Sequence, residues 1–136
     1  MKLLSVFIAI FAVTATFAQK PPASGQKSTA QAQKDTKQVS DAKLKQLEAA
    51  YSASKLAFTK KPKDAKAKKS YVDATFAVGM GRMYSESLPP RVKYVKALEA
   101  FREVLKTDPK HKGAQENQDM IVKIYKQMGR PVPGGN

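Results

Sequence analysis

Cysteine and tryptophan are absent from this 136-residue sequence, and it contains a single histidine. Without cysteine the chain can form no disulfide and no thiolate metal site, and it cannot carry a lipid on a cysteine. Zinc ligation around His111 would need clustered carboxylates, and the 11 acidic residues form no such cluster. We therefore expect neither a metal nor a cofactor, and we expect His111 to be a solvated surface residue.

Residues with catalytic chemistry are present but lie in no recognisable arrangement. The candidate nucleophiles share no motif with His111 that would pair one of them with a base; they are Ser40, Ser52, Ser54, Ser70, Ser85 and Ser87. Residues 79–81 (Gly-Met-Gly) lack both the preceding strand and the Gly-Lys-Ser/Thr ending of a phosphate-binding loop. The sequence therefore predicts a protein without enzymatic activity.

The first 18 residues have the pattern of a cleavable export signal. A short basic start with Lys2 precedes an apolar run, and Thr16 and Ala18 occupy the two small-residue positions before a cleavage point. Residues 3–18 would span roughly 24 Å as a helix, which is short of the ~30 Å hydrocarbon core and argues against a retained anchor. We expect a periplasmic or secreted protein, cleaved near Ala18, with no integral membrane span in the mature chain.

Negative charge is scarce, because 25 Lys and Arg residues face 11 Asp and Glu residues, for a net charge of +14. Such a surplus favours attraction to anionic partners but says nothing about the fold. The densest basic segment surrounds Pro62 and is opposed there only by Asp64; it contains Lys55, Lys60, Lys61, Lys63, Lys66, Lys68 and Lys69. This ridge is either a binding site for phosphate, lipopolysaccharide, anionic lipid or nucleic acid, or a solvated surface that keeps the protein soluble.

Composition divides the remaining chain into three parts. Residues 19–39 hold one aliphatic side chain, Val39, and cannot bury enough apolar surface to offset the entropy of ordering, so they are expected to be a disordered linker. Residues 40–129 carry the apolar pattern of a helical domain. Residues 130–136 are rich in proline and glycine and are expected to be a disordered tail.

The helical region is expected to form about four helices and no strand, which makes the fold all-α. The first helix starts near Ser40, a good N-cap, and ends at Pro62. The second and third cover about residues 64–84 and 91–106. The fourth follows Asp108, a capping residue, with Pro109 at its first helical position, and ends at Gly129 as its C-cap. Gly79 and Gly81, inside the second helix, are best explained by the close approach of a neighbouring helix.

An internal repeat supports a hairpin arrangement. Residues 50–62 align without a gap on residues 97–109, with identities that include a proline after each helix. The spacing of one group of residues resembles the second helix of a tetratricopeptide repeat: Tyr94, Ala97, Phe101, Val104 and Pro109. Gly81 and Tyr84 resemble its first helix, where glycine lets the paired helix approach, and Tyr125 with Gly129 resembles the same part of a final helix.

The resemblance covers about residues 41–129 and departs from the family in its spacing. Ten residues separate Tyr84 from Tyr94 where the family usually has six, and the repeat period is 47 rather than 34. The resemblance implies a short antiparallel helical-hairpin array, with one full hairpin between two flanking helices. It also implies a groove lined by the second and fourth helices, and thus these partner-binding residues: Lys69, Asp73, Arg82, Ser85, Asn117, Lys123 and Lys126.

Three hypotheses of function follow. The first is an exported, non-enzymatic adaptor that binds an acidic protein or peptide. The second is a polyanion-binding protein that acts through the lysine ridge, for instance on an anionic envelope surface. The third is a structural subunit that forms homo-oligomers, because short helical arrays usually need at least three repeats for independent stability.

Overall fold

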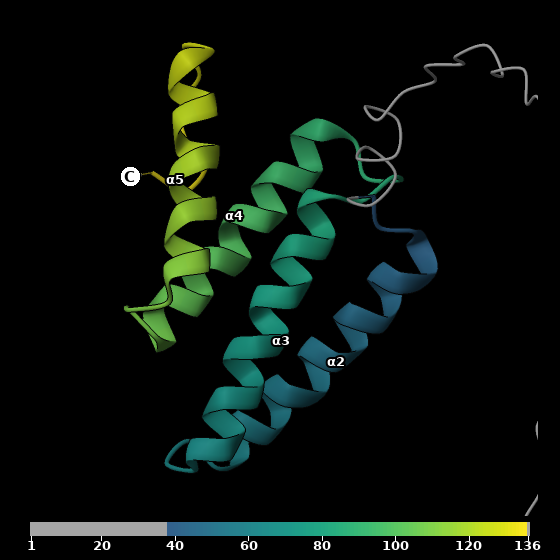
Figure 1. Cartoon of the computed structure of the whole chain (residues 1–136), viewed down its shortest axis with the longest axis vertical. Helices are drawn as coiled ribbons and strands as arrows, with labels where there is room; N and C mark the ends of the chain where they lie inside the picture. Colours follow the sequence, from purple (N-terminus) through teal and green to yellow (C-terminus); the bar gives the residue numbers. More distant parts are fainter. Residues whose placement is uncertain (1–37, 136) are drawn as a thin grey trace, which may run out of the picture.

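The computed structural model describes residues 38–135, and within them the chain forms four helices: α2 (Asp41–Lys60), α3 (Ala65–Met83), α4 (Pro90–Thr107) and α5 (Lys112–Gln127) (Figure 1). The only β-type pairing in this part of the chain is an isolated bridge between Val39 and Ser85. The all-α prediction is therefore confirmed. The predicted export signal and residues 19–37 of the predicted linker lie outside the described residues.

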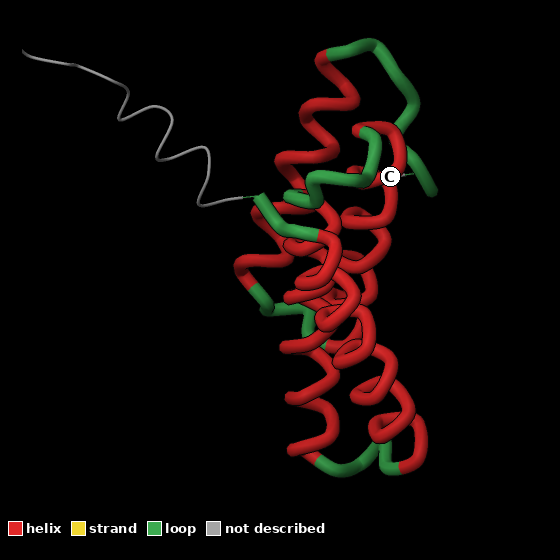
Figure 2. The backbone as a smooth tube through the Cα atoms, turned by 90° about the vertical axis from the view of Figure 1, so that its right-hand side faces the viewer, coloured by secondary structure: helices red, strands yellow, loops and turns green. Residues whose placement is uncertain are grey.

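The helices follow one another in alternating directions. The chain descends along α2, rises along α3, descends along α4 and rises along α5 (Figure 1). Each helix packs against the next one in the sequence. Seen from the side, the helices share one long direction, and the loop between α2 and α3 lies at the lower end of the molecule (Figure 2). This is the arrangement of a short antiparallel array. None of the described helices combines the length and the apolar character that a membrane crossing requires.

Capping residues set where the helices begin. Ser40 Oγ accepts a hydrogen bond from Lys43 N, and Asp64 Oδ1 accepts one from Ala67 N at 2.9 Å, as good N-caps do. The predicted start of the last helix is wrong. Asp108 turns the chain by accepting a hydrogen bond from Lys110 N at 3.2 Å, and α5 begins only after His111.

His111 is the N-cap of α5 rather than a solvated surface residue. Its Nδ1 atom accepts a hydrogen bond from Ala114 N at 3.1 Å. Its ring lies 4.7 Å from the ring of Phe76 in α3, and the side chain is half-buried. The prediction failed because a lone histidine gives no local signal of a contact with an aromatic ring 35 residues earlier in the chain.

The core lies where α3, α4 and α5 meet. Ala97, Phe101 and Val104, which the repeat resemblance singled out, are all completely buried. The three tyrosines of the same motif pack at the edge of this cluster; they are Tyr84, Tyr94 and Tyr125. The 3-4 spacing of α4 therefore identifies its core-facing side correctly. Full burial of a side chain such as Phe101 contributes about 1.5–3 kcal/mol to stability.

Both glycines of α3 allow a neighbouring helix to approach closely, as expected, but each glycine faces a different helix. A Cβ atom built on Gly79 would lie 2.9 Å from Phe101 Cε1 in α4. One built on Gly81 would lie 2.6 Å from Leu47 Cδ1 in α2. The resemblance assigned Gly81 to the paired helix, α4; that assignment is wrong, because Gly79 makes the approach to α4 and Gly81 makes the approach to α2.

Both ends of the described chain are attached to the helices. Val39 N donates to Tyr84 O at 2.9 Å, and Glu86 N donates to Val39 O at 3.2 Å, so the end of the predicted linker is held against the α3–α4 connection. The tail after Gly129, expected to be disordered, folds back in residues 130–135: Val132 packs against the core, and Arg102 of α4 donates to the carbonyls of Pro133 and Gly135. A guanidinium has five N–H donors and can hold such a glycine-rich segment through its backbone carbonyls.

Candidate functional site

The groove implied by the repeat resemblance is partly taken up by contacts within the chain. Lys69 and Asp73 are exposed on α3 but form an ion pair with each other at 2.5 Å. The guanidinium of Arg82 is mostly buried and lies 3.4 Å from Glu48 Oε1 of α2. Arg82 is therefore engaged within the chain, whereas Lys69 and Asp73 stay exposed to solvent.

The remaining residues of the predicted groove separate into two groups. Ser85 is only 2% exposed and its Oγ accepts a hydrogen bond from Leu88 N, so its assignment to an exposed surface is wrong. Asn117 is half-buried and donates to Gly113 O within its own helix. Lys123 and Lys126 are both exposed on α5 and remain accessible. Helical periodicity predicts a face, but it does not predict which polar side chains on that face find partners.

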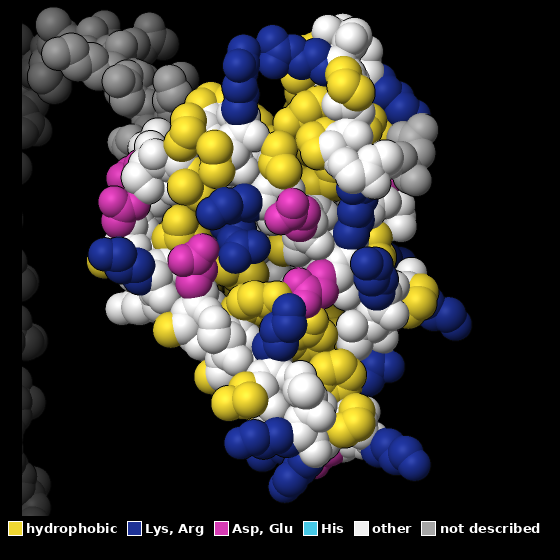
Figure 3. All heavy atoms as spheres, turned by 180° about the vertical axis from the view of Figure 1, so that it is seen from behind, with side chains coloured by type: hydrophobic (Ala, Val, Ile, Leu, Met, Phe, Trp, Pro, Cys, Tyr) yellow, Lys and Arg dark blue, Asp and Glu magenta, His cyan; other side chains and the backbone are white. Residues whose placement is uncertain are grey.

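The lysine ridge is centred on the turn between α2 and α3. Exposed lysines gather at this lower end of the molecule (Figure 3); they are Lys60, Lys61, Lys63, Lys66 and Lys68. In the described part of the chain none of these five forms an ion pair within 4.0 Å. Asp64 lies among them, and its pKa is lowered by the hydrogen bond from Ala67 N and, more weakly, by Lys61 and Lys66. Lys55 and Lys69 differ from these five lysines because they form ion pairs with Glu103 and Asp73, respectively.

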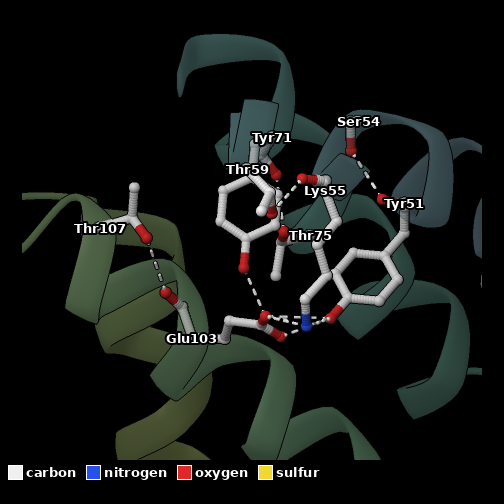
Figure 4. Close-up of polar contacts among 8 residues, drawn as sticks. All are labelled: Tyr51, Ser54, Lys55, Thr59, Tyr71, Thr75, Glu103 and Thr107. Atoms are coloured by element: carbon white, nitrogen blue, oxygen red, sulfur yellow. Dashed lines mark hydrogen bonds and ion pairs between the residues drawn. The ribbon is translucent and has the colours of Figure 1, made fainter. Parts of the chain in front are cut away.

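Lys55 instead belongs to a polar cluster that joins three helices (Figure 4). The carboxylate of Glu103 in α4 accepts hydrogen bonds from Tyr51 Oη at 2.8 Å, from Lys55 Nζ at 2.9 Å and from the hydroxyl of Tyr71. Tyr51 and Lys55 come from α2, and Tyr71 comes from α3. The ring of Tyr71 also stacks on that of Phe58 at 5.0 Å. We call these four hydrogen-bonded residues the Glu103 cluster.

The electrostatics of the Glu103 cluster suit a structural role. Burial acts to raise the pKa of Glu103, but the hydrogen bonds from Tyr71, Lys55 and Tyr51 outweigh it and lower that pKa. Burial and the contact with Glu103 raise the pKa of Tyr71, burial raises that of Tyr51, and the hydrogen bonds to Tyr51 and Glu103 raise that of Lys55. All four pKa values move away from neutral pH, whereas a proton-transferring group needs a pKa near it.

An apolar recess opens between the start of α4 and the end of α5, close to the end of the molecule where Val39 is held. Its volume is about 140 Å³, and it is lined by Pro90, Arg91, Tyr94, Ile121, Ile124, Tyr125, Met128 and Arg130. Ile121 is completely buried at its base, whereas the side chain of Met128 is 52% exposed. The arginines are the only charged residues of this lining, and both are exposed.

Local backbone geometry brings the two arginines to the recess. Pro90 occupies the first position of α4 and places Arg91 in its first turn. Gly129 follows α5 with a φ of 64°, which reverses the chain so that Arg130 N donates to Tyr125 O at 3.0 Å. The glycine was predicted as a C-cap, and the repeat resemblance singled out Tyr94 and Tyr125. The recess was missed because its arginines lie at helix ends, where periodicity carries no signal.

No cluster of three or more His, Asp or Glu residues within residues 38–135 is arranged to hold a metal ion. No family model, no curated protein and no solved structure matches the chain. Its chemistry must therefore be inferred from its own surface, where the recess combines apolar side chains with two exposed arginines and the turn between α2 and α3 gathers five exposed lysines.

Proposed function

We propose that the protein is an exported, non-enzymatic module of the tetratricopeptide type that binds an acidic segment of another protein. The repeat-like spacing from Tyr94 to Pro109 supports the family likeness, as do the burial of Ala97, Phe101 and Val104 and the packing of each helix on the next. The family likeness suggests protein binding as the activity, and the positive charge of the chain suggests an acidic partner.

The recess between α4 and α5 is the observation that carries this proposal. Apolar side chains line its interior, and Arg91 and Arg130 add two positive charges with no acidic residue among the lining. Guanidinium groups bind carboxylates through paired hydrogen bonds, and they are the residues most often used for such recognition at interfaces. An apolar pocket with a few convergent polar groups is also the usual form of a binding site.

Charge reversal tests the proposal. The double variant Arg91→Glu, Arg130→Glu should weaken binding of an acidic peptide at least 10-fold, measured by fluorescence anisotropy on the mature chain. The matched control, Lys63→Glu with Lys68→Glu, changes the net charge equally at the opposite end of the molecule. Equal losses in the two variants would mean that only net charge attracts the peptide, and the recess would have no part in binding.

Polyanion binding at the α2–α3 turn is the second candidate, favoured by the five exposed lysines gathered there. Contacts of this kind are strongly salt-dependent, because phosphate or sulfate binding releases condensed counterions. Binding to heparin should therefore weaken steeply between low and physiological salt, and Lys61→Gln with Lys63→Gln should reduce that slope. An affinity that hardly changes with salt would eliminate this candidate.

Self-association is the third candidate, and an exposed apolar strip on α2 favours it. Leu56 is 56% exposed and lies beside Ala53 and Ala57, where a further helix of the array would pack. Light scattering on residues 19–136 at high concentration tests this. A strict monomer would exclude a structural subunit of this kind, and a dimer that Leu56→Glu dissociates would support it.

A further inference from the structure

The size of the recess limits what can enter it. Its volume of about 140 Å³ is close to the ~150 Å³ of an apolar protein cavity that holds one benzene molecule. Drug-sized ligands occupy sites of about 300–1,000 Å³, so the recess is too small for such a molecule or for an acyl chain. One leucine, isoleucine or phenylalanine side chain fits, whereas the indole ring of tryptophan is too large.

The lining of the recess favours an apolar occupant. Ile121 and Ile124 provide branched aliphatic surface, and Tyr94 and Tyr125 provide aromatic surface. Met128 is flexible and polarizable, which lets the opening adjust to side chains of slightly different shape. These side chains stabilise a buried apolar group. The lining has no buried charge that would stabilise a polar group.

The surroundings of the recess favour acidic neighbours of that occupant. Arg91 and Arg130 come from two different elements, the first turn of α4 and the segment after α5. Lys93 lies outside this lining and donates a hydrogen bond to Ser85 O at 3.5 Å, so the two arginines provide the positive charge of the recess. A segment whose apolar side chain enters the recess would therefore bring its neighbouring residues close to both arginines.

We infer that the recess is an anchor pocket for one leucine, isoleucine or phenylalanine of a partner segment in which that residue stands next to aspartate or glutamate. This inference rests on the proposed function and adds to it the identity of the recognised side chain. The apolar residue provides the anchor, and the acidic residues pair with the arginines. Small apolar residues leave the pocket underfilled, and the indole ring of tryptophan exceeds its volume.

Peptides of equal charge test the anchor directly. The set Glu-Glu-X-Glu-Glu, with X as leucine, phenylalanine, alanine or tryptophan, is labelled and titrated with the mature protein. Leucine and phenylalanine should bind about 10- to 100-fold more tightly than alanine, which corresponds to burial of one large apolar side chain. The tryptophan peptide should bind at least 10-fold more weakly than the phenylalanine peptide.

Variants of two exposed methionines, Met120 on α5 and Met128 at its C-cap, form the matched pair. Met128→Trp places a bulky ring at the opening of the recess and obstructs it, whereas Met120→Trp adds the same ring to a position outside it, where Met120 is 42% exposed. Helical circular dichroism and thermal unfolding verify that both variants fold. Met128→Trp should remove the preference for leucine over alanine, and Met120→Trp should keep it.

The outcomes separate the anchor from the proposed function. If all four peptides bind equally and the arginine reversal abolishes binding, acidic segments are recognised but the anchor pocket is wrong. If Met128→Trp and Met120→Trp both keep the preference for leucine, the apolar side chain binds elsewhere and the anchor is equally wrong. If none of the four peptides binds, the proposed function fails and the anchor fails with it.

Discussion

Tyr51 on α2 donates a hydrogen bond to the carboxylate of Glu103 on α4 at 2.8 Å, although 52 residues separate them in the sequence. α3 contributes to the same carboxylate through the hydroxyl of Tyr71. The first helix of the array is therefore connected to the third by polar contacts as well as to the second by packing. We regard the Glu103 cluster as the contact that fixes α2 in its place, and its removal is the natural first test of the fold.

Replacement of Glu103 by alanine should destabilise the protein by about 2–3 kcal/mol, measured by urea unfolding. Hydrogen bonds to a charged group contribute about 1.5–3 kcal/mol each, but the carboxylate is 30% exposed and the three bonds act together, so their sum overstates the loss. Glu99→Ala, an exposed position on the same helix, is the control and should change the free energy of unfolding by less than about 0.5 kcal/mol. Similar losses of unfolding free energy in both variants would show that the Glu103 cluster makes no special contribution to stability.

The Glu103 cluster also predicts the pH range of greatest stability. The pKa of Glu103 is lowered by folding, so its contribution is present above about pH 4.3, the unfolded value, and is lost as the pH falls. The pKa values of Tyr51 and Tyr71 are raised, so their contribution is complete below about pH 10 and is lost as the pH rises further. The difference in unfolding free energy between wild type and Glu103→Gln should therefore be constant from about pH 5.5 to 9 and shrink on both sides. A difference that does not change between pH 7 and pH 3 would contradict this.

The two glycines of α3 should respond differently to alanine. At Gly79 the new methyl group meets the buried ring of Phe101 at 2.9 Å and the Cβ of Ala100 at 3.2 Å, neither of which can move freely. Overpacking should outweigh the gain in helix propensity and destabilise the protein by about 1–2 kcal/mol. At Gly81 the nearest atom is the end of the half-exposed Leu47 side chain, which can rotate away. Thermal unfolding should therefore place Gly81→Ala close to wild type, and the reverse order of stabilities would show that the two helix contacts are misassigned.

Gly129 links helix termination to the recess. Its φ of 64° is unfavourable for a residue with a Cβ, so Gly129→Ala should cost about 1 kcal/mol of stability. Because this turn positions Arg130, the variant should also weaken acidic-peptide binding several-fold under conditions where the protein stays folded. Gly135→Ala, also at positive φ but beyond the recess lining, is the control and should leave peptide binding unchanged. If Gly129→Ala binds the acidic peptide with wild-type affinity, Arg130 takes no part in recognition of the peptide.

Local sequence patterns predicted the helices and their core-facing sides, because Ala97, Phe101 and Val104 follow the 3-4 spacing that packing requires. They did not predict contacts made between helices. Glu103 gave no sign that it would bind Tyr51, and Ser85 gave none that it would be buried, because both depend on residues brought together only by folding. The same limit explains the recess: each of its arginines looked like an ordinary charged residue at a helix end.

Binding of the leucine-containing acidic peptide to wild type and to the two charge-reversal variants tests the central claim most directly. Arg91→Glu with Arg130→Glu should weaken binding at least 10-fold, while Lys63→Glu with Lys68→Glu, which carries the same net charge, should weaken it less than threefold. Circular dichroism before the titration establishes that both variants are helical. Equal affinity for the peptide in the two variants would contradict the assignment of the recess as the binding site.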